Sequence, residues 1–211
     1  MDKAIYEIED GQGRLIHVYS VDEAWQSACF VDEDIKYEPV FGYFRAFHHI
    51  FDLNPGIRDI LMIGGGTYSY PEYVISVKPD VCCDVVEMDD ETEDIARMYF
   101  HLDEFEKEYP GRMKLIFMEG MDYLMTTDKK YDAIINDAYV GPEPYLNFSM
   151  ELIRKHMKEG GIYAVNLALK SNESPEAEIS RLREVFAEIT TFREDCEFNS
   201  EKNYNLVVCA R

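Results

Sequence analysis

Three places in the sequence put groups suited to nucleoside binding directly after a short apolar run. The turn Gly64-Gly65-Gly66 follows the first run, Glu87 ends the second, and Glu119-Gly120 follows the third. A glycine turn lets backbone amides approach a ligand, and a carboxylate after the second strand can accept hydrogen bonds from both ribose hydroxyls. An acid after the third strand can accept from an adenine amino group. Together these groups predict a nucleoside site.

The glycine turn also indicates which nucleoside ligand fits. A dinucleotide fingerprint requires a third glycine after this strand, and Ser69 occupies that place here. A pyrophosphate depends on that glycine-rich turn at the start of the helix. The sequence therefore favours a ligand without a pyrophosphate over a nicotinamide dinucleotide.

Strand-like and helix-like patterns alternate between these groups, which predicts an α/β fold with a mostly parallel sheet covered on both faces. Two extended stretches joined by turn residues 10–13 predict a short N-terminal β-hairpin before it. We therefore expect a hairpin appendage at residues 1–35 and a Rossmann-like domain with a seven-stranded sheet at residues 36–211. The expected strands are Ala4–Glu9, Arg14–Tyr19, Asp59–Ile63, Val81–Glu87, Met113–Met118, Tyr131–Asn136, Ile162–Leu167, Thr190–Arg193 and Asn205–Ala210. The expected helices are Val40–Phe51, Asp89–Leu102, Leu146–Met157 (ended by Gly160-Gly161) and Ser174–Phe186.

Charge restricts the classes of partner. The 211 residues include 42 acidic and 21 basic side chains, for a formal net charge of −21. Such a surface repels nucleic acid and attracts cationic ligands such as polyamines, although it also serves solubility alone. No apolar run is long enough to span a membrane, and the N-terminus lacks the features of a signal peptide. These observations predict a cytoplasmic protein.

The cysteines and histidines do not form a metal or nucleophile pattern. The five cysteines are odd in number and irregular in spacing, which argues against a disulfide framework or a zinc site. His48-His49 and His101 lack the spacing or carboxylate partners of metal ligands. We expect no metal.

The order of the motifs resembles the spermidine synthase family over nearly the whole chain, and the match is closest to its short, divergent members. The stretches that carry the resemblance are Trp25-Gln26-Ser27 (a cofactor-contacting strand), Phe41–His48 (the helix lining the substrate site), Asp59–Gly66 (the glycine motif), Val86-Glu87-Met88-Asp89 (the ribose motif), Met118–Leu124 (the adenine motif) and Tyr131–Ala138 (the strand presenting a catalytic aspartate).

This resemblance implies a role for each group. Asp137 would be the general base, although its carboxylate could instead cap a turn. Tyr43 and Tyr139 would line the substrate site, although each could equally be a core or rim aromatic. The donor would be S-adenosylmethionine or its decarboxylated form, the acceptor a small molecule such as a polyamine, and the assembly a homodimer. The implied donor-binding residues are Gln26, Gly64, Gly65, Gly66, Glu87, Met88, Glu119 and Gly120.

Two departures from the family pattern concern the binding of amines. Thr67 stands where the family has an aspartate that holds the donor amine, and Val140 stands where it has a second acid that holds the polyamine. A partly buried ammonium needs a countercharge. We therefore expect S-adenosylmethionine to bind at least as well as its decarboxylated form. Aminopropyl transfer is the family default, with methyl transfer or non-catalytic nucleoside binding as alternatives.

Overall fold

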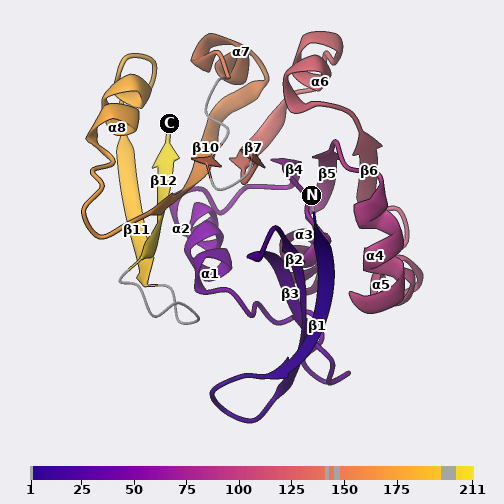
Figure 1. Ribbon diagram of the computed structural model, residues 1–211. Helices are drawn as coiled ribbons and strands as arrows, with labels where there is room; N and C mark the ends of the chain where they lie inside the picture. Colours follow the sequence, from indigo (N-terminus) through magenta and orange to yellow (C-terminus); the bar gives the residue numbers. More distant parts are fainter. Residues whose placement is uncertain (1, 141–142, 145–147, 196–202) are drawn as a thin grey trace.

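The protein is described here from a computed structural model covering residues 2–140, 143–144, 148–195 and 203–211 (Figure 1). A seven-stranded sheet with the order β11-β12-β10-β7-β4-β5-β6 lies between two layers of helices. The chain runs outward from β4 to β6 and then returns to β7 on the other side of β4. This reversal of strand order creates a switch point between β4 and β7, where ligands bind in such sheets.

All seven strands expected for this sheet are confirmed. Six of them run parallel, and β12 is antiparallel to both of its neighbours, β10 and β11. The central strands β4 and β7 are short and buried almost throughout on both faces, as a sheet covered by helices on both sides requires. The strands are β4 Asp59–Ile63, β5 Cys82–Glu87, β6 Met113–Phe117, β7 Tyr131–Asn136, β10 Met157–Leu169, β11 Ile189–Asp195 and β12 Tyr204–Ala210.

The two faces of the sheet carry separate helical layers and separate cores. Helices α1 to α5 pack on one face, around Phe47 and Phe105, and α6 to α8 pack on the other, around Leu124 and Ile153. These side chains are fully buried. The helices are α1 Gly42–His48, α2 Ile50–Leu53, α3 Ser69–Val77, α4 Glu91–Tyr99, α5 Leu102–Glu108, α6 Gly120–Thr126, α7 Met150–Lys155 and α8 Glu176–Arg183. No described helix is long and apolar enough to cross a membrane.

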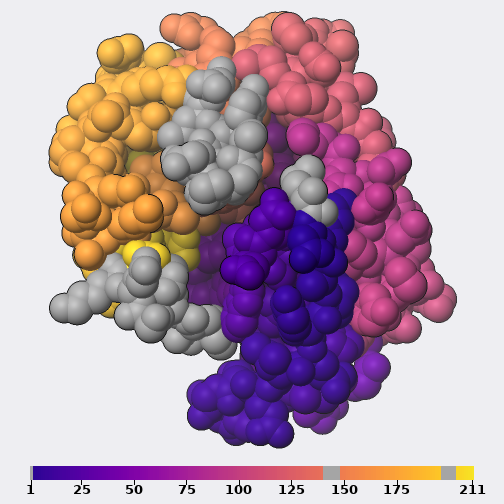
Figure 2. Space-filling model, in the orientation of Figure 1, coloured from indigo at the N-terminus to yellow at the C-terminus, as the bar shows by residue number. Residues whose placement is uncertain are grey.

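The N-terminal region holds three strands, where the residue pattern predicts two and the family resemblance places a further strand at Trp25-Gln26-Ser27. β1 (Lys3–Glu9), β2 (Leu15–Val21) and β3 (Ala24–Phe30) form an antiparallel sheet in that order, drawn in indigo in Figures 1 and 2. One of its faces packs on the main core through Tyr19 and Cys29. The other buries a small cluster of its own, Ile16, Val18, Ala28 and Phe30, under Val40. This sheet is therefore a third layer beside the edge of the main sheet that contains the switch point.

All four expected helices have different bounds in the structure. The helix expected over Val40–Phe51 divides at His49 into α1 and α2, and the helix expected over Ser174–Phe186 is the shorter α8. The helix expected over Asp89–Leu102 divides into α4 and α5, because His101 takes a left-handed φ of 65° between them. The helix expected to end at Gly160-Gly161 already ends at Lys155, and both glycines lie within β10. The expected start of that helix, Leu146, lies outside the described residues. Two further short strands follow β7: β8 (Tyr139–Val140) and β9 (Glu143–Pro144).

One buried acid in α3 links folding to pH. Glu72 is 2% exposed, and its Oε1 has no hydrogen-bond partner among the described residues. Burial raises the pKa of Glu72 well above its ordinary value. The folded protein therefore keeps this carboxyl protonated at pH values where the unfolded chain has lost the proton. Its contribution to stability is present below the unfolded pKa of about 4.5 and is lost as the pH rises toward the folded value.

We expect Glu72→Gln to remove the loss of stability that Glu72 causes as the pH rises. A single bound proton gives a slope of about 1.4 kcal/mol per pH unit in the free energy of unfolding. Denaturant titrations between pH 5 and pH 8 should show the variant gaining stability over the wild type as the pH rises. Glu176→Gln, a change at an exposed glutamate of α8, is the control and should follow the wild type. Parallel curves for wild type and Glu72→Gln would contradict the expectation.

Candidate active site

The glycine turn after β4 lies against the segment that follows β7. Gly64 and Gly66 have positive φ values of 83° and 51°, which side chains rarely adopt. A Cβ on Gly64 would lie 2.7 Å from backbone atoms of Asp137 and Ala138. A Cβ on Gly66 would lie 2.6 Å from Ser27 Oγ in β3. The absence of side chains therefore lets three segments meet at the switch point.

Glu87 at the end of β5 fixes two turns of this site. Its Oε2 accepts hydrogen bonds from the backbone N–H groups of Gly65 and Gly66, each at 3.0 Å. Its Oε1 accepts from Met88 at 2.8 Å and from Asp89 at 3.0 Å. One carboxylate thus fixes the position of the glycine turn relative to the start of the loop after β5. Glu87, the predicted acceptor of the ribose hydroxyls, therefore also holds the backbone of the two turns beside it.

We expect Glu87→Ala to weaken binding of methylthioadenosine by about 1–3 kcal/mol, since a half-buried hydrogen-bond acceptor is removed. The loss of four N–H contacts should also lower the melting temperature. Glu87→Gln retains one acceptor oxygen and should bind with intermediate affinity. Calorimetric titration of both variants checks this, and unchanged affinity in Glu87→Ala would remove Glu87 from the site.

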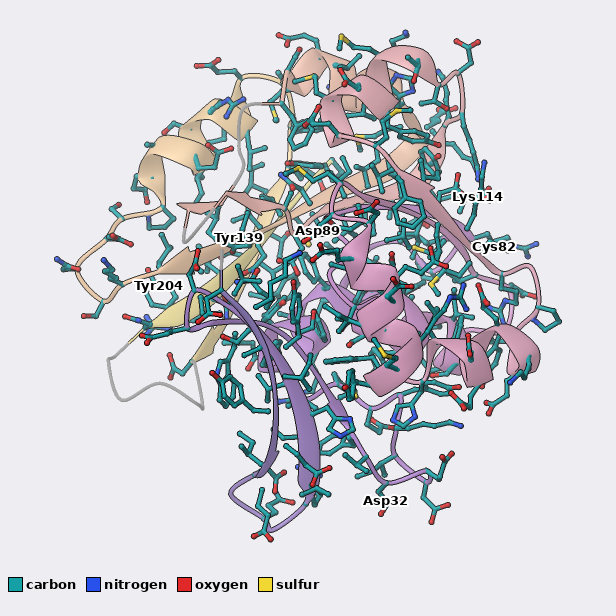
Figure 3. All side chains as sticks on the ribbon, turned by 45° about the vertical axis from the view of Figure 1, so that its right-hand side comes forward. Asp32, Cys82, Asp89, Lys114, Tyr139 and Tyr204 are labelled. Atoms are coloured by element: carbon teal, nitrogen blue, oxygen red, sulfur yellow. The ribbon has the colours of Figure 1, made fainter. Side chains whose placement is uncertain are left out.

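The N-terminal sheet contacts both of these turns. Ser27 Oγ accepts a hydrogen bond from the N–H of Thr67 at 3.1 Å. Lys3 Nζ donates to Asp89 Oδ2 at 2.6 Å and to Glu91 Oε2 at 2.7 Å. Figure 3 shows Asp89 where the N-terminal sheet meets the seven-stranded sheet. The sheet therefore helps to position the residues that follow β4 and β5.

Asp137 follows β7 and is held by two side chains from different elements. Tyr43 of α1 donates its hydroxyl hydrogen to Asp137 Oδ2 at 3.0 Å. Asn166 of β10 donates from Nδ2 to Oδ1, also at 3.0 Å. Burial raises the pKa of Asp137 to about 7, against the lowering effect of both hydrogen bonds. A carboxyl group with this pKa can accept a proton near neutral pH.

The other residues expected in the site lie around the same edge of the sheet. Gln26 lies in β3, where its side chain donates to the carbonyl of Ala24. Met88 is 71% exposed, and Glu119 caps the start of α6 by accepting from the N–H of Asp122. A Cβ on Gly120 would meet Ile63 at 2.5 Å, so close packing requires this glycine.

Tyr139 makes two backbone contacts rather than packing as a free aromatic. Its hydroxyl donates to the carbonyl of Asn166 and accepts from the N–H of Ala168, both at 3.2 Å. The ring therefore connects the segment after Asp137 to β10. Its predicted contact with a substrate stays a prediction, whereas its role in holding this segment is visible.

Two residues that contact the site, Ser27 and Asn166, have no role predicted from the sequence. Asn166 lies in a buried strand whose sequence pattern is typical of the hydrophobic core. The register of β10 beside β7 is what brings its side chain to Asp137. Ser27 lies next to Gln26 in a motif already noted, and its partner Thr67 is distant in sequence. A polar residue inside an apolar strand was the available signal for Asn166. Among the described residues, no cluster of histidine, cysteine and acidic side chains could hold a metal ion.

The fold and the strand-end groups place the protein in the Rossmann-like class with a methyltransferase-type sheet. Residues 41–197 match the spermine/spermidine synthase domain. The chain belongs to the spermine/spermidine synthase family.

Curated relatives support this assignment. The polyamine aminopropyltransferase of Thermococcus onnurineus is 30% identical over 196 residues, which cover 89% of this chain and 64% of the relative. The polyamine aminopropyltransferase of Alkaliphilus metalliredigens is 33% identical over 125 residues, covering 58% of this chain and 43% of that protein. The chain thus spans less than two thirds of the length of these relatives.

Solved structures share the fold. A probable spermidine synthase from Corynebacterium glutamicum superposes with a TM-score of 0.78 at 20% identity, covering 99% of this chain and 76% of that one. A spermidine synthase in complex with the transition-state analogue AdoDATO gives a TM-score of 0.62 at 17% identity, with coverages of 98% and 73%. Human methyltransferase-like protein 13 in complex with SAH also gives 0.62, at 20% identity, with coverages of 78% and 80%.

Proposed function

We propose that this protein transfers an aminopropyl group from decarboxylated S-adenosylmethionine to the amine of a polyamine-type acceptor. The observation that carries the proposal is the Asp137 carboxylate, held between Tyr43 and Asn166 beside the glycine turn, with a pKa of about 7. Family membership favours this reaction over methyl transfer and over binding alone. The high negative charge of the chain suits a cationic small molecule rather than nucleic acid.

The reaction needs positioning and one proton acceptor. The neutral amine of the acceptor attacks the aminopropyl carbon bonded to the sulfonium sulfur. A carbon–nitrogen bond forms, the carbon–sulfur bond breaks, and its electron pair stays on sulfur in methylthioadenosine. The attacking nitrogen becomes cationic and gives its extra proton to Asp137. Tyr43 and Asn166 orient the carboxylate, and holding both reactants in line supplies much of the rate.

A product assay tests the proposal. The protein is incubated with decarboxylated S-adenosylmethionine and 1,4-diaminobutane, and methylthioadenosine and the aminopropylated amine are separated by chromatography. Both products should form in equal amounts. S-adenosylhomocysteine formed from S-adenosylmethionine would instead indicate methyl transfer. Tight nucleoside binding without any product would indicate a non-catalytic protein.

The pH dependence of the rate should follow the protonation of the Asp137 carboxyl group. The base form is needed, so kcat/KM should rise with pH through about 7. The hydrogen bond from Tyr43 lowers the pKa of Asp137, so its removal in Tyr43→Phe raises that pKa. The acidic limb of the profile should therefore move to higher pH in this variant. An unmoved limb would show that another group controls the profile.

We also propose a homodimeric, cytoplasmic protein in which residues 1–35 form an appendage to the catalytic domain. The N-terminal sheet packs on the main core of its own chain through Tyr19 and Cys29, and the homodimer is what resemblance to the spermidine synthases implies. Light scattering at high concentration should give the mass of a dimer. A monomer over the whole concentration range would argue against it.

A further inference from the structure

Met88 leaves a large apolar side chain in solvent directly after β5. It is 71% exposed, the highest value among the large hydrophobic side chains of the described residues. Its thioether sulfur is therefore open to reagents in solution. Single exposed apolar side chains are common on protein surfaces, so the position of Met88 matters more than its exposure.

Backbone hydrogen bonds place Met88 between the two segments that flank the end of β5. On one side, the N–H of Gly64 donates to the carbonyl of Val86 at 2.9 Å. On the other side, the N–H of Met118 donates to the carbonyl of Glu87 at 3.1 Å. The N–H of Met88 itself donates to Glu87 Oε1 at 2.8 Å. Met88 thus lies between the glycine turn and the segment that leads into α6, so a ligand that spans these strand ends passes over it.

A hydroperoxide oxidises an exposed methionine in one balanced step. A lone pair of the thioether sulfur attacks one oxygen of hydrogen peroxide, an S–O bond forms, and the O–O bond breaks. The departing oxygen takes up the proton and leaves as water. Sulfur is oxidised by two electrons, and the peroxide is reduced. The product, methionine sulfoxide, is polar, and methionine sulfoxide reductases reduce it back to methionine.

We propose that Met88 is a site of reversible oxidation that lowers the affinity of the protein for its nucleoside. The inference rests on the nucleoside site of the proposed function, but not on the acceptor or on the transfer step. A bound nucleoside covers Met88 and shields its sulfur from the oxidant. In the sulfoxide, the added oxygen loses its water when the nucleoside covers it, which costs free energy unless a donor replaces that water.

The surroundings of Met88 offer no such donor. Its sequence neighbours Glu87 and Asp89 are acids, and an ionised carboxylate only accepts hydrogen bonds. The N–H groups of Met88 and Asp89 already donate to Glu87 Oε1. The sulfoxide oxygen would therefore be covered without a partner.

Met98 provides a matched control. It is 66% exposed, close to the value for Met88, but it lies seven residues beyond the start of α4, or roughly 10 Å along the helix. The two sulfurs should therefore react at similar rates in the free protein. Bound methylthioadenosine should slow the reaction of Met88 alone.

The experiment treats wild type, Met88→Leu and Met98→Leu with hydrogen peroxide, with and without methylthioadenosine. Peptide mass spectrometry follows sulfoxide formation at each position, and calorimetry measures the affinity for methylthioadenosine before and after treatment. Nucleoside at 100 times its Kd should slow the oxidation of Met88 by up to about 100-fold, the fraction left unbound, and leave Met98 unchanged. Treatment should weaken binding to wild type and Met98→Leu by about 10- to 100-fold, the cost of covering an unpartnered polar group. Met88→Leu should keep the affinity that it had before treatment, and methionine sulfoxide reductases should restore the wild type.

Oxidation of Cys82 would give a different result. Cys82 is the exposed residue among the described cysteines, and it lies at the opposite end of β5 from Met88. A thiol reductant reverses cysteine disulfides and sulfenic acids, whereas methionine sulfoxide requires its reductases. A loss of affinity that a thiol reductant reverses, or that Met88→Leu shares, would assign the effect to another residue and overturn the inference.

The remaining outcomes separate the inference from the proposed function. Equal oxidation of Met88 with and without bound nucleoside, or unchanged affinity in the oxidised wild type, overturns the inference while the proposed function stands. An untreated wild type that does not bind methylthioadenosine contradicts both. Shielding of Met88 and loss of affinity on oxidation, in a protein that forms no transfer product, would support the inference and remove the proposed function.

Discussion

Replacing Asp137 by Asn should lower kcat for aminopropyl transfer by a factor of about 10²–10⁴, the contribution of a positioned general base. The amide can still receive a hydrogen bond from Tyr43 but cannot take up the proton that the attacking nitrogen must lose. Binding of the donor involves no proton transfer to Asp137, so the affinity of the protein for the donor should change little. Single-turnover rates with saturating donor, together with calorimetric donor binding, measure the two effects separately.

Asn166→Leu provides a matched comparison for this result. It removes one of the two hydrogen bonds to Asp137 and keeps the carboxylate, so the rate should fall less than in Asp137→Asn. Because that bond lowers the pKa of Asp137, the acidic limb of the pH profile should also move upward. Near wild-type kcat in Asp137→Asn at every pH would mean that water or another group accepts the proton.

The alternating pattern predicted the main sheet well because its central strands, β4, β5 and β7, are short, largely apolar and bounded by turns. The third N-terminal strand was not in that prediction for a specific reason. Residues Asp22 and Glu23 form its two-residue turn with φ values of 48° and 67°, a conformation that usually selects Asn-Gly or Asp-Gly. Glu23 stands where this signal has glycine, so the pairing of Val21 with Ala24 emerges only in the folded sheet.

The predicted helix boundaries were wrong where tertiary packing overrides the local apolar periodicity. The apolar spacing around Tyr99 continues through Leu102, yet His101 breaks the helix in a left-handed conformation. Further on, Met157 fits the stripe of α7 but belongs to β10, where it pairs with Tyr131. The sequence around Met157 is compatible with a helix and with a strand, and pairing with β7 selects the strand.

The candidate site was predictable to the extent that it follows strand ends. Gly64 and Asp137 come directly after strands and Glu87 is the last residue of one, so parallel pairing brings the three to one edge. The residues that hold Asp137 come from α1 and β10, and no sequence spacing relates them to it. The contact of Asn166 with Asp137 depends on strand order and register, which a single sequence does not specify.

Thr67 is the position where one substitution should most change the choice of donor. Its side chain is fully buried, its N–H donates to Ser27 Oγ, and its Oγ1 lies 3.4 Å from Ser69 Oγ. The family resemblance expects an aspartate here to hold the donor amine. In Thr67→Asp a carboxylate would be buried without a partner in the free protein, so the melting temperature should fall.

Decarboxylated S-adenosylmethionine should reverse that loss, because its ammonium supplies the missing countercharge. We expect Thr67→Asp to bind this donor about 10- to 100-fold more tightly than the wild type does, or roughly 1.5–3 kcal/mol. S-adenosylmethionine should gain less, since its own carboxylate already pairs with its ammonium and repels the new aspartate. Thr67→Asn, which has the same shape without the charge, should leave the preference between donors unchanged. Titration of the three proteins with both donors decides the matter. A wild type that already favours the decarboxylated donor, with no gain in Thr67→Asp, would show that an acid elsewhere in the chain holds the donor amine.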